Sequence, residues 1–220
     1  MHWGINMKIG ILGTGDVGRA LGNGFVALGH EVKMGSRTAG GDKAKEWVTH
    51  AGKAASEGTF AEATSFGELV VFATLGTATE AVIGSAGPDS FSGKIVWDAT
   101  NPLDFSAGMP PKLAITGYDS LGERVQKALP NAHVVKCFNT VGNALMFKPD
   151  LDGGPPTMFI AGNDDGAKQK TTALLKDFGW ETSDIGGIEG SRYLEAMCLT
   201  WVLHGIKSGQ WMHAFKLLSK

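Results

Sequence analysis

Cysteine is scarce in this chain of 220 residues, which contains only Cys137 and Cys198. Two cysteines cannot form a disulfide framework or a four-thiolate zinc site, and they fit a reducing compartment. The six histidines are scattered and show neither metal-ligand spacing nor a Ser-His-Asp arrangement. We therefore expect a cytoplasmic protein without a metal site.

An excess of charge of one sign is also missing. Lys and Arg number 20 against 22 Asp and Glu, a net charge of −2, so we expect no polycationic surface for nucleic acid or an anionic membrane. The least charged stretch, 69–88, is interrupted by Glu80 and diluted by glycine and threonine, so no membrane span is predicted. Residues 1–6 lack the features of a signal peptide, and we treat them as extra residues before a candidate start at Met7.

Glycine, by contrast, is abundant: 32 residues, roughly twice the usual share of about 7%. Short β-branched runs alternate with segments of helical period throughout the chain, which is typical of a parallel sheet with crossover helices. The predicted strands cover 8–12, 30–34, 55–60, 69–73, 94–99, 133–138, 156–161 and, at an edge, 180–185. The predicted helices run from 17 to 28, 42 to 51, 120 to 129, 164 to 178 and 191 to 206, with one more beginning near 77.

Besides the first helix, side-chain caps are predicted at four helix starts. Thr77-Ala78-Thr79-Glu80 and Ser120-Leu121-Gly122-Glu123 have the spacing of a capping box. Asp42 and Asp164 are candidate N-caps of two other helices. The last helix is apolar nearly all round, which predicts that it is covered on both sides.

The strongest motif is a GxGxxG placed directly after the first strand and at the start of a helix, Gly13-Thr14-Gly15-Asp16-Val17-Gly18. Gly13 permits the tight turn, Gly15 lets the backbone approach a pyrophosphate, and Gly18 lets the helix pack on the sheet. The helix N-terminus adds free N–H groups and a positive dipole end. In that context the motif indicates dinucleotide binding rather than an ordinary glycine-rich turn, and Asp16 is interpreted as a helix N-cap, not a catalytic acid.

The end of the second strand indicates which nucleotide is bound. An NAD site usually has Asp or Glu there, but this chain has Ser36-Arg37-Thr38. The Arg37 guanidinium and the two hydroxyls can donate to a 2′-phosphate, so NADP is the predicted cofactor. The alternative is a solvated arginine on a loop.

Ligands of such sheets lie beyond the carboxyl ends of the strands. The segments there are Thr74-Leu75-Gly76-Thr77, Asn101-Pro102-Leu103 and Asn139-Thr140-Val141, none of which contains His, Lys, Cys, Asp or Glu. A carbonyl reductase needs a proton donor for the developing alkoxide, whereas hydride transfer to a flavin-like ring mainly needs orientation and exclusion of water. The sequence thus disfavours alcohol chemistry, and we assign no catalytic residue.

Several segments of the chain resemble the NADPH:deazaflavin oxidoreductase family, whose acceptor is coenzyme F420, and most closely a bacterial branch of it. The resemblance covers nearly all of 7–220, and the segments that carry it are 7–18, Gly35-Ser36-Arg37, 100–105, 108–111 and 136–140. It implies a single Rossmann domain over 7–220, with about 140–220 forming a small C-terminal α/β extension. It also implies that NADP is held by the glycine motif, Ser36 and Arg37, with nicotinamide near Asn101, Pro102 and Asn139. The chain is also similar to the reductase domain of membrane ferric reductases, where NADPH reduces a flavin.

These observations predict a cytoplasmic NADPH-dependent reductase that passes hydride to a flavin or a deazaflavin. Two alternatives stay open: a small imine or carbonyl reductase, and an NADP-binding sensor without turnover. The nucleotide site is expected to include Thr74, Leu75, Thr77 and Thr140 as well. Met197 and Trp201, four residues apart on the last helix, either wall the acceptor pocket or belong to the core or to a homodimer interface.

Overall fold

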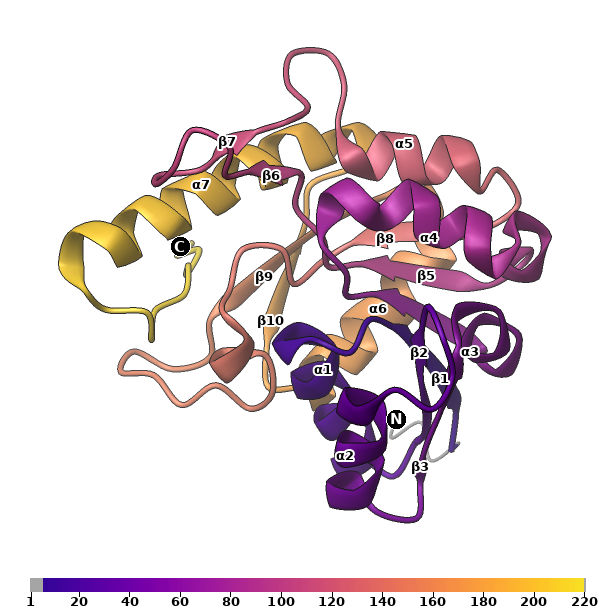
Figure 1. Ribbon diagram of the computed structural model, residues 1–220. Helices are drawn as coiled ribbons and strands as arrows, with labels where there is room; N and C mark the ends of the chain where they lie inside the picture. Colours follow the sequence, from indigo (N-terminus) through magenta and orange to yellow (C-terminus); the bar gives the residue numbers. More distant parts are fainter. Residues whose placement is uncertain (1–5, 220) are drawn as a thin grey trace.

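The computed structural model of the protein describes residues 6–219 and has an eight-stranded sheet between two layers of helices (Figure 1). Residues 1–5, most of the segment treated above as extra, lie outside the described part. The strands of the sheet are β1 (Lys8–Leu12), β2 (Glu31–Ser36), β3 (Ala55–Thr59), β4 (Leu69–Phe72), β5 (Ile95–Asp98), β8 (His133–Lys136), β9 (Thr157–Gly162) and β10 (Glu181–Asp184). A separate two-stranded hairpin is formed by β6 (Leu103–Asp104) and β7 (Lys112–Leu113).

The strand order is β10-β9-β8-β5-β4-β1-β2-β3. Six neighbouring strands are parallel, in the order β8, β5, β4, β1, β2 and β3. Strand β9 is antiparallel to β8, and β10 is parallel to β9. This confirms the predicted Rossmann-like, mostly parallel sheet and its C-terminal α/β extension. The direction of winding reverses between β1 and β4, and such a switch point opens a crevice at the carboxyl ends of the strands.

Each face of the sheet has its own hydrophobic core. One core includes Phe25, Trp47 and Leu175, and the other includes Val82 and Val125. The first face is therefore covered by α1 (Asp16–Ala27), α2 (Asp42–Ala51) and α6 (Asp165–Asp177), and the second by α3 (Phe60–Phe66), α4 (Thr79–Ala86) and α5 (Leu121–Ala128). The last helix, α7 (Ser191–Ser208), packs against α5 and runs beside the hairpin in Figure 1. Short 3₁₀ turns occupy Gly76–Ala78, Pro88–Phe91, Asn143–Leu145 and Ile188–Gly190.

Two of the predicted caps are wrong because glycine occupies the cap position. The N-cap of α1 is Gly15 and that of α2 is Gly41, so Asp16 and Asp42 lie in the first helical turn. Neither glycine has a side chain that could satisfy the first N–H groups, which leaves these groups free for a ligand. Asp164 does cap α6, since its side chain accepts from the N–H of Ala167.

The capping box predicted at Thr77–Glu80 is also wrong. A 3₁₀ turn occupies Gly76–Ala78, which delays the start of α4 to Thr79. A complete box lies instead at Thr59–Glu62, where it opens α3, a helix that the sequence analysis did not predict.

The box predicted at Ser120 is present only in part. Ser120 Oγ accepts from the N–H of Glu123, but the N–H of Ser120 donates to Asp119 rather than to the Glu123 carboxylate.

The prediction that α7 is covered on both sides is wrong. Leu194, Cys198 and Val202 are buried, but Tyr193 is 72% exposed and Leu203 is 49% exposed. The side of the helix that carries Tyr193 and Leu203 is therefore open to solvent.

Candidate functional site

The turn between β1 and α1 is shaped by its three motif glycines. Gly13 has φ +132°, and a Cβ there would lie 2.4 Å from the carbonyl oxygen of Ala73. A Cβ on Gly18 would lie 2.2 Å from the carbonyl oxygen of Gly13, whereas one on Gly15 would meet no atom within 4 Å. Gly13 and Gly18 are thus required by the packing of the protein itself. Gly15 faces open space, as expected of a position kept clear for a ligand.

That open space belongs to a cavity of about 710 Å³ at the carboxyl ends of β1, β2 and β4. It gathers the glycine turn, the end of β2, the segment after β4 and one side of α4. The lining residues are Gly13, Thr14, Gly15, Asp16, Val17, Ser36, Arg37, Lys43, Phe60, Ala73, Thr74, Leu75, Ala78, Ala81, Val82, Ser85 and Asn143. A cavity of about 210 Å³ at the opposite ends of the strands is too small for a dinucleotide.

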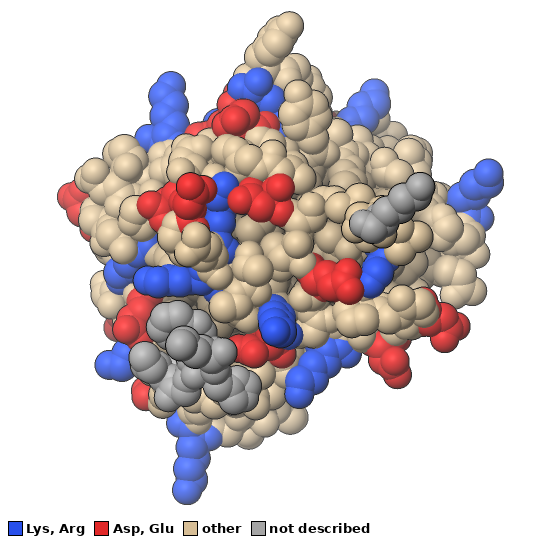
Figure 2. Space-filling model, turned by 180° about the vertical axis from the view of Figure 1, so that it is seen from behind, with Lys and Arg blue, Asp and Glu red and all other residues tan. Residues whose placement is uncertain are grey.

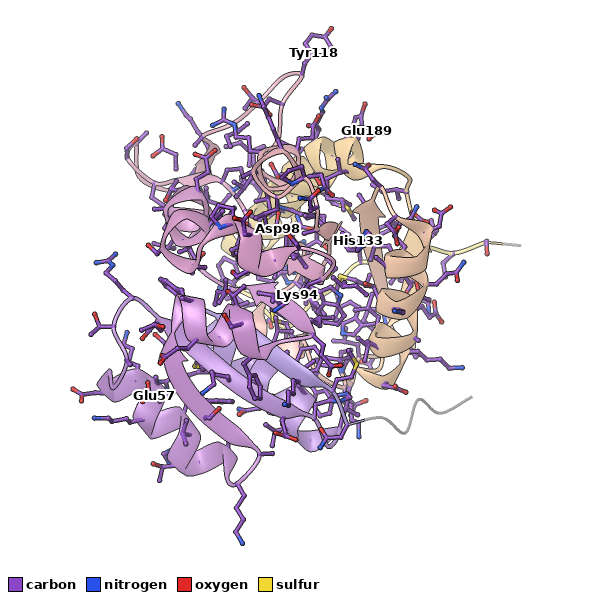
Figure 3. All side chains as sticks on the ribbon, turned by 90° about the vertical axis from the view of Figure 1, so that its right-hand side faces the viewer. Glu57, Lys94, Asp98, Tyr118, His133 and Glu189 are labelled. Carbon is purple, nitrogen blue, oxygen red and sulfur yellow. The ribbon has the colours of Figure 1, made fainter. Side chains whose placement is uncertain are left out.

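Two cations line the part of the cavity beside β2. Arg37 is exposed at the end of β2, and Lys43 comes from the first turn of α2. Ser36 Oγ donates to the Thr38 carbonyl oxygen at 2.7 Å. Glu57, which is labelled in Figure 3, accepts from the N–H of Gly40 at 2.8 Å, and the two bonds hold the loop after β2. Sequence reasoning missed Lys43, although a lysine beside the N-terminus of a helix that follows a nucleotide-binding loop was a usable signal.

Asn101 and Asn139 form a reciprocal pair that joins the loops after β5 and β8. Asn101 Nδ2 donates to the Asn139 carbonyl oxygen at 2.8 Å, and Asn139 Nδ2 donates to Asn101 Oδ1 at 3.0 Å. Asn139 Nδ2 also donates to the Leu194 carbonyl oxygen of α7 at 2.8 Å. The next residues in each loop, Pro102 and Thr140, are buried. The structure therefore brings Asn101, Asn139 and the start of α7 together.

The remaining predicted residues divide between the cavity and its surroundings. Thr74 and Leu75 line it, and the buried Thr74 hydroxyl has no hydrogen-bond partner in the protein. Thr38 and Thr77 are exposed and are not among the lining residues. Asn143, which sequence reasoning missed, links the cavity to the loop that begins at Asn139.

A buried cluster of three charges lies at the ends of β5 and β8, just before the loops that carry the asparagine pair, and was also missed. Lys136 Nζ donates to Asp98 Oδ2 at 2.9 Å and to Glu195 Oε1 at 2.8 Å. Lys136 and Asp98 are 0% exposed and Glu195 is 1% exposed. Burial alone would lower the pKa of Lys136, but attraction to the two carboxylates exceeds that effect and raises its pKa above the ordinary value. Figure 3 shows Asp98 inside the molecule, far from the protruding Tyr118.

Backbone N–H groups and one hydroxyl add further donors, so that each carboxylate oxygen of the cluster accepts at least one hydrogen bond. Asp98 Oδ1 accepts from the N–H of Thr100 at 3.0 Å and from its hydroxyl at 2.6 Å. Glu195 accepts from the N–H groups of Leu121 and Gly122, both at 3.0 Å, which are the first donors of α5. The cluster thereby fastens α7 to α5 and to the ends of β5 and β8.

Both cysteines are unsuited to nucleophilic chemistry. Burial raises the pKa of the Cys137 thiol well above its ordinary value and that of Cys198 to about 11. Their thiols therefore stay protonated near neutral pH, and the thiolate is the nucleophilic form.

Met197 and Trp201 are both half-buried on α7. Trp201 Nε1 donates to the His213 carbonyl oxygen at 2.9 Å, and its ring stacks on the His213 imidazole with the centroids 4.8 Å apart. A Cβ on Gly142 would lie 3.1 Å from the Trp201 ring, so the indole sits against the loop after β8. Trp201 thus joins the C-terminal segment to the loop that contains Asn139.

Acidic and basic side chains alternate on the face shown in Figure 2, without a broad region of one sign. Over residues 6–219, no helix has both the length and the apolar character needed to cross a membrane. The same part of the chain holds no group of three or more His, Cys, Asp or Glu side chains arranged to bind a metal.

The chain is similar in sequence and in structure to known NADP-dependent oxidoreductases. Residues 8–102 match the family model described as NADP oxidoreductase coenzyme F420-dependent. A solved structure from Arthrobacter sp. FB24, of a protein to which an F420-dependent NADP-reductase role is assigned, shares 38% sequence identity. It has a TM-score of 0.91, and the match covers 97% of this chain and 100% of that one.

Two more distant relatives share parts of this description. Metalloreductase STEAP3 of Rattus norvegicus is 28% identical over 196 residues, which is 87% of this chain. The chain spans only 36% of the length of that relative. A reductive aminase from Aspergillus terreus, solved with NADPH and ethyl levulinate, has a TM-score of 0.67 at 20% identity, with 93% of this chain and 63% of that one covered. This last likeness concerns the fold.

Proposed function

The chain belongs to the family of coenzyme-F420-dependent NADP oxidoreductases, and from this membership we propose that it transfers hydride between NADP(H) and a flavin-like or deazaflavin acceptor. It is an NADP-dependent oxidoreductase by family. The observation that carries the proposal is the cavity that combines a free helix N-terminus with the cations Arg37 and Lys43. Its chemistry fits a dinucleotide with an additional phosphate.

The phosphates are the best-defined part of this proposal. The glycine turn, 13–18, and the N-terminal N–H groups of α1 would hold the pyrophosphate, because Gly15 leaves the approach open and no side chain caps the helix. Arg37 and Lys43 would hold the 2′-phosphate, with Ser36 and Thr38 shaping the loop. The unpartnered hydroxyl of Thr74 gives the same cavity a further polar group.

We place the nicotinamide end toward the loops after β4, β5 and β8. Thr74, Leu75, Thr77, Asn101, Pro102, Asn139 and Thr140 would surround it. Bound NADPH supplies the hydride, so the residues of the chain only need to orient the ring and to exclude water. The fixed geometry of the Asn101–Asn139 pair suits this role, because each amide is already held by the other loop.

The acceptor would lie on the α7 side of this end. Met197 and Trp201 would form one wall of a flat slot, with Asn139 and Thr140 at its edge. The exposed side of α7, with Tyr193 and Leu203, is where we would place the contact of a homodimer. We further propose a cytoplasmic location, where reduced thiols such as Cys137 and Cys198 persist.

The test is an NADPH oxidation assay with flavins, coenzyme F420, a panel of quinones and a cyclic imine. The proposal predicts turnover with a flavin or a deazaflavin, and a strong preference for NADPH over NADH. Turnover with the imine alone would favour the imine reductase alternative. Tight NADPH binding without turnover on any acceptor would favour a sensor.

A further inference from the structure

The buried cluster of Asp98, Lys136 and Glu195 does not balance its own charge. It contains two carboxylates and one ammonium, so its formal net charge is −1. The backbone N–H groups of α5 that bind Glu195 carry part of a helix dipole, which offsets only about half a charge. A buried net negative charge therefore remains.

Neighbouring ionised groups on α5 and α7 do not neutralise it. Arg124 pairs with Asp119 at 2.9 Å, and Arg192 pairs with Glu123 through its guanidinium. Each of these pairs is neutral as a unit and lies nearer to solvent than the cluster does. These arginines therefore leave the net negative charge of the cluster uncompensated, and its field extends to the asparagine loops.

The cluster lies close to the place proposed for nicotinamide. Asp98 precedes Asn101 by three residues and Lys136 precedes Asn139 by three, while Glu195 follows Leu194, which accepts from Asn139. Three residues span at most about 10 Å. The backbone of Asp98 and that of Lys136 are therefore each within about 10 Å of the asparagine that follows, so we take about 10 Å as the distance from the net charge to this site.

We propose that the Asp98–Lys136–Glu195 cluster is a positioning and electrostatic device that favours the oxidised, positively charged nicotinamide over the reduced, neutral one. The inference rests on the proposed function, which puts nicotinamide at the asparagine pair. A site that binds NADP⁺ more tightly relative to NADPH lowers the reduction potential of the bound couple, which makes bound NADPH a stronger hydride donor. The cluster would thus bias the site toward reduction of the acceptor.

The size of the effect follows from the distance. A unit charge about 10 Å away, at an effective dielectric constant of about 20, changes a binding equilibrium by roughly tenfold. Because the α5 dipole offsets part of the charge, we expect a change of about three- to tenfold when one carboxylate is neutralised. The charge effect is measured by the ratio of the two dissociation constants, Kd(NADP⁺)/Kd(NADPH). A distortion of the site would weaken the binding of both nucleotides alike and leave this ratio unchanged.

The test compares Glu195→Gln with Glu195→Asp by calorimetry. Glu195→Gln removes the charge and keeps the size of the side chain, so the ratio should rise about three- to tenfold. Glu195→Asp keeps the charge and changes the geometry, so the ratio should stay within twofold of wild type even if both constants increase. Asp98→Asn is a second neutralising variant and should change the ratio in the same direction.

An unchanged ratio in folded Glu195→Gln and Asp98→Asn would overturn the inference, and so would an equal change in Glu195→Asp. If both neutralising variants fail to fold, the two dissociation constants of the wild-type protein are compared instead. NADP⁺ should then bind at least as tightly as NADPH, and tenfold weaker binding of NADP⁺ would overturn the inference. Failure of the proposed function is distinct, because it would appear as no turnover with any acceptor while both dissociation constants can still be measured.

Discussion

Arg37 is the residue on which the choice of nucleotide depends most. Its guanidinium is exposed at the end of β2 and lines the cavity together with Lys43. Arg37→Ala should weaken NADP(H) binding by about 1.5–3 kcal/mol, the usual loss of a hydrogen bond to a charged group, and should leave NAD(H) binding nearly unchanged. Isothermal titration calorimetry with both nucleotides measures the difference.

Lys53→Ala is the matched control, since Lys53 is an exposed cation that does not line the cavity. It should leave both affinities unchanged. An equal loss for NADP(H) and NAD(H) in Arg37→Ala would show that the arginine does not recognise the 2′-phosphate.

A substitution at Gly15, in the turn between β1 and α1, should affect nucleotide binding without affecting folding. A Cβ on Gly15 would meet no protein atom within 4 Å, so Gly15→Val should fold with a melting temperature close to wild type. Its branched carbon would occupy the space proposed for the pyrophosphate, so NADP(H) binding should vanish in calorimetry.

Gly18→Ala is the contrasting variant, because its Cβ would lie 2.2 Å from the Gly13 carbonyl oxygen. It should lower the melting temperature, unlike Gly15→Val. A folded Gly15→Val protein with normal NADP affinity would refute the placement of the pyrophosphate.

At the scale of elements, α7 connects the sheet to the proposed acceptor side. Trp201 packs against the loop after β8 and holds the C-terminal segment through His213. If the indole walls the acceptor slot, Trp201→Ala should raise the acceptor KM severalfold while the NADPH dissociation constant stays near wild type. Steady-state kinetics together with NADPH titration measure both quantities.

If Trp201 has only a structural role, Trp201→Ala should give different results. The melting temperature would fall by many degrees, or a dimer would become a monomer in light scattering, with acceptor kinetics intact. Leu203→Ala, on the exposed side of the same helix, is the control and should leave the acceptor KM unchanged.

The elements also show which parts of the fold local sequence can predict. The glycine turn, the apolar strands and the Asp164 cap depend on residues close together in the chain, and each was found where predicted. The start of α4 was misplaced because the 3₁₀ turn at Gly76 depends on a distant contact: a Cβ there would lie 2.1 Å from the Asn101 carbonyl oxygen.

Across the whole molecule, the missed features are those that depend on long-range pairing. Asp98, Lys136 and Glu195 come from three distant segments, and no local pattern indicates that their charges meet inside the protein. Lys43 and Asn143 enter the cavity because of how α2 and the loop after β8 pack on the sheet. The nucleotide motif could be predicted from sequence, but its electrostatic surroundings required the fold.

The stability of the whole molecule should depend on pH through His30. This side chain is 7% exposed, and burial lowers its pKa, an effect that Asp177 only partly offsets. Below about pH 6.5 the unfolded chain gains a proton on this histidine that the folded protein does not take up, so the free energy of unfolding falls as the pH decreases. Urea unfolding between pH 7.5 and 5.5 should show this fall.

His30→Gln should remove that part of the pH dependence, whereas His50→Gln, at an exposed histidine, should retain it. The same dependence in His30→Gln as in wild type would assign the effect to other groups.

The most direct test of the account is the path of the hydride itself. NADPH labelled with deuterium on one face of C4 of the nicotinamide would be oxidised by the protein with a deazaflavin, whose reduced C5 retains the transferred atom. We predict that deuterium from one face alone appears at C5, without exchange with solvent, and that Gly15→Val abolishes the transfer. Solvent hydrogen at C5, or no transfer to any flavin-like acceptor despite tight NADPH binding, would contradict the account.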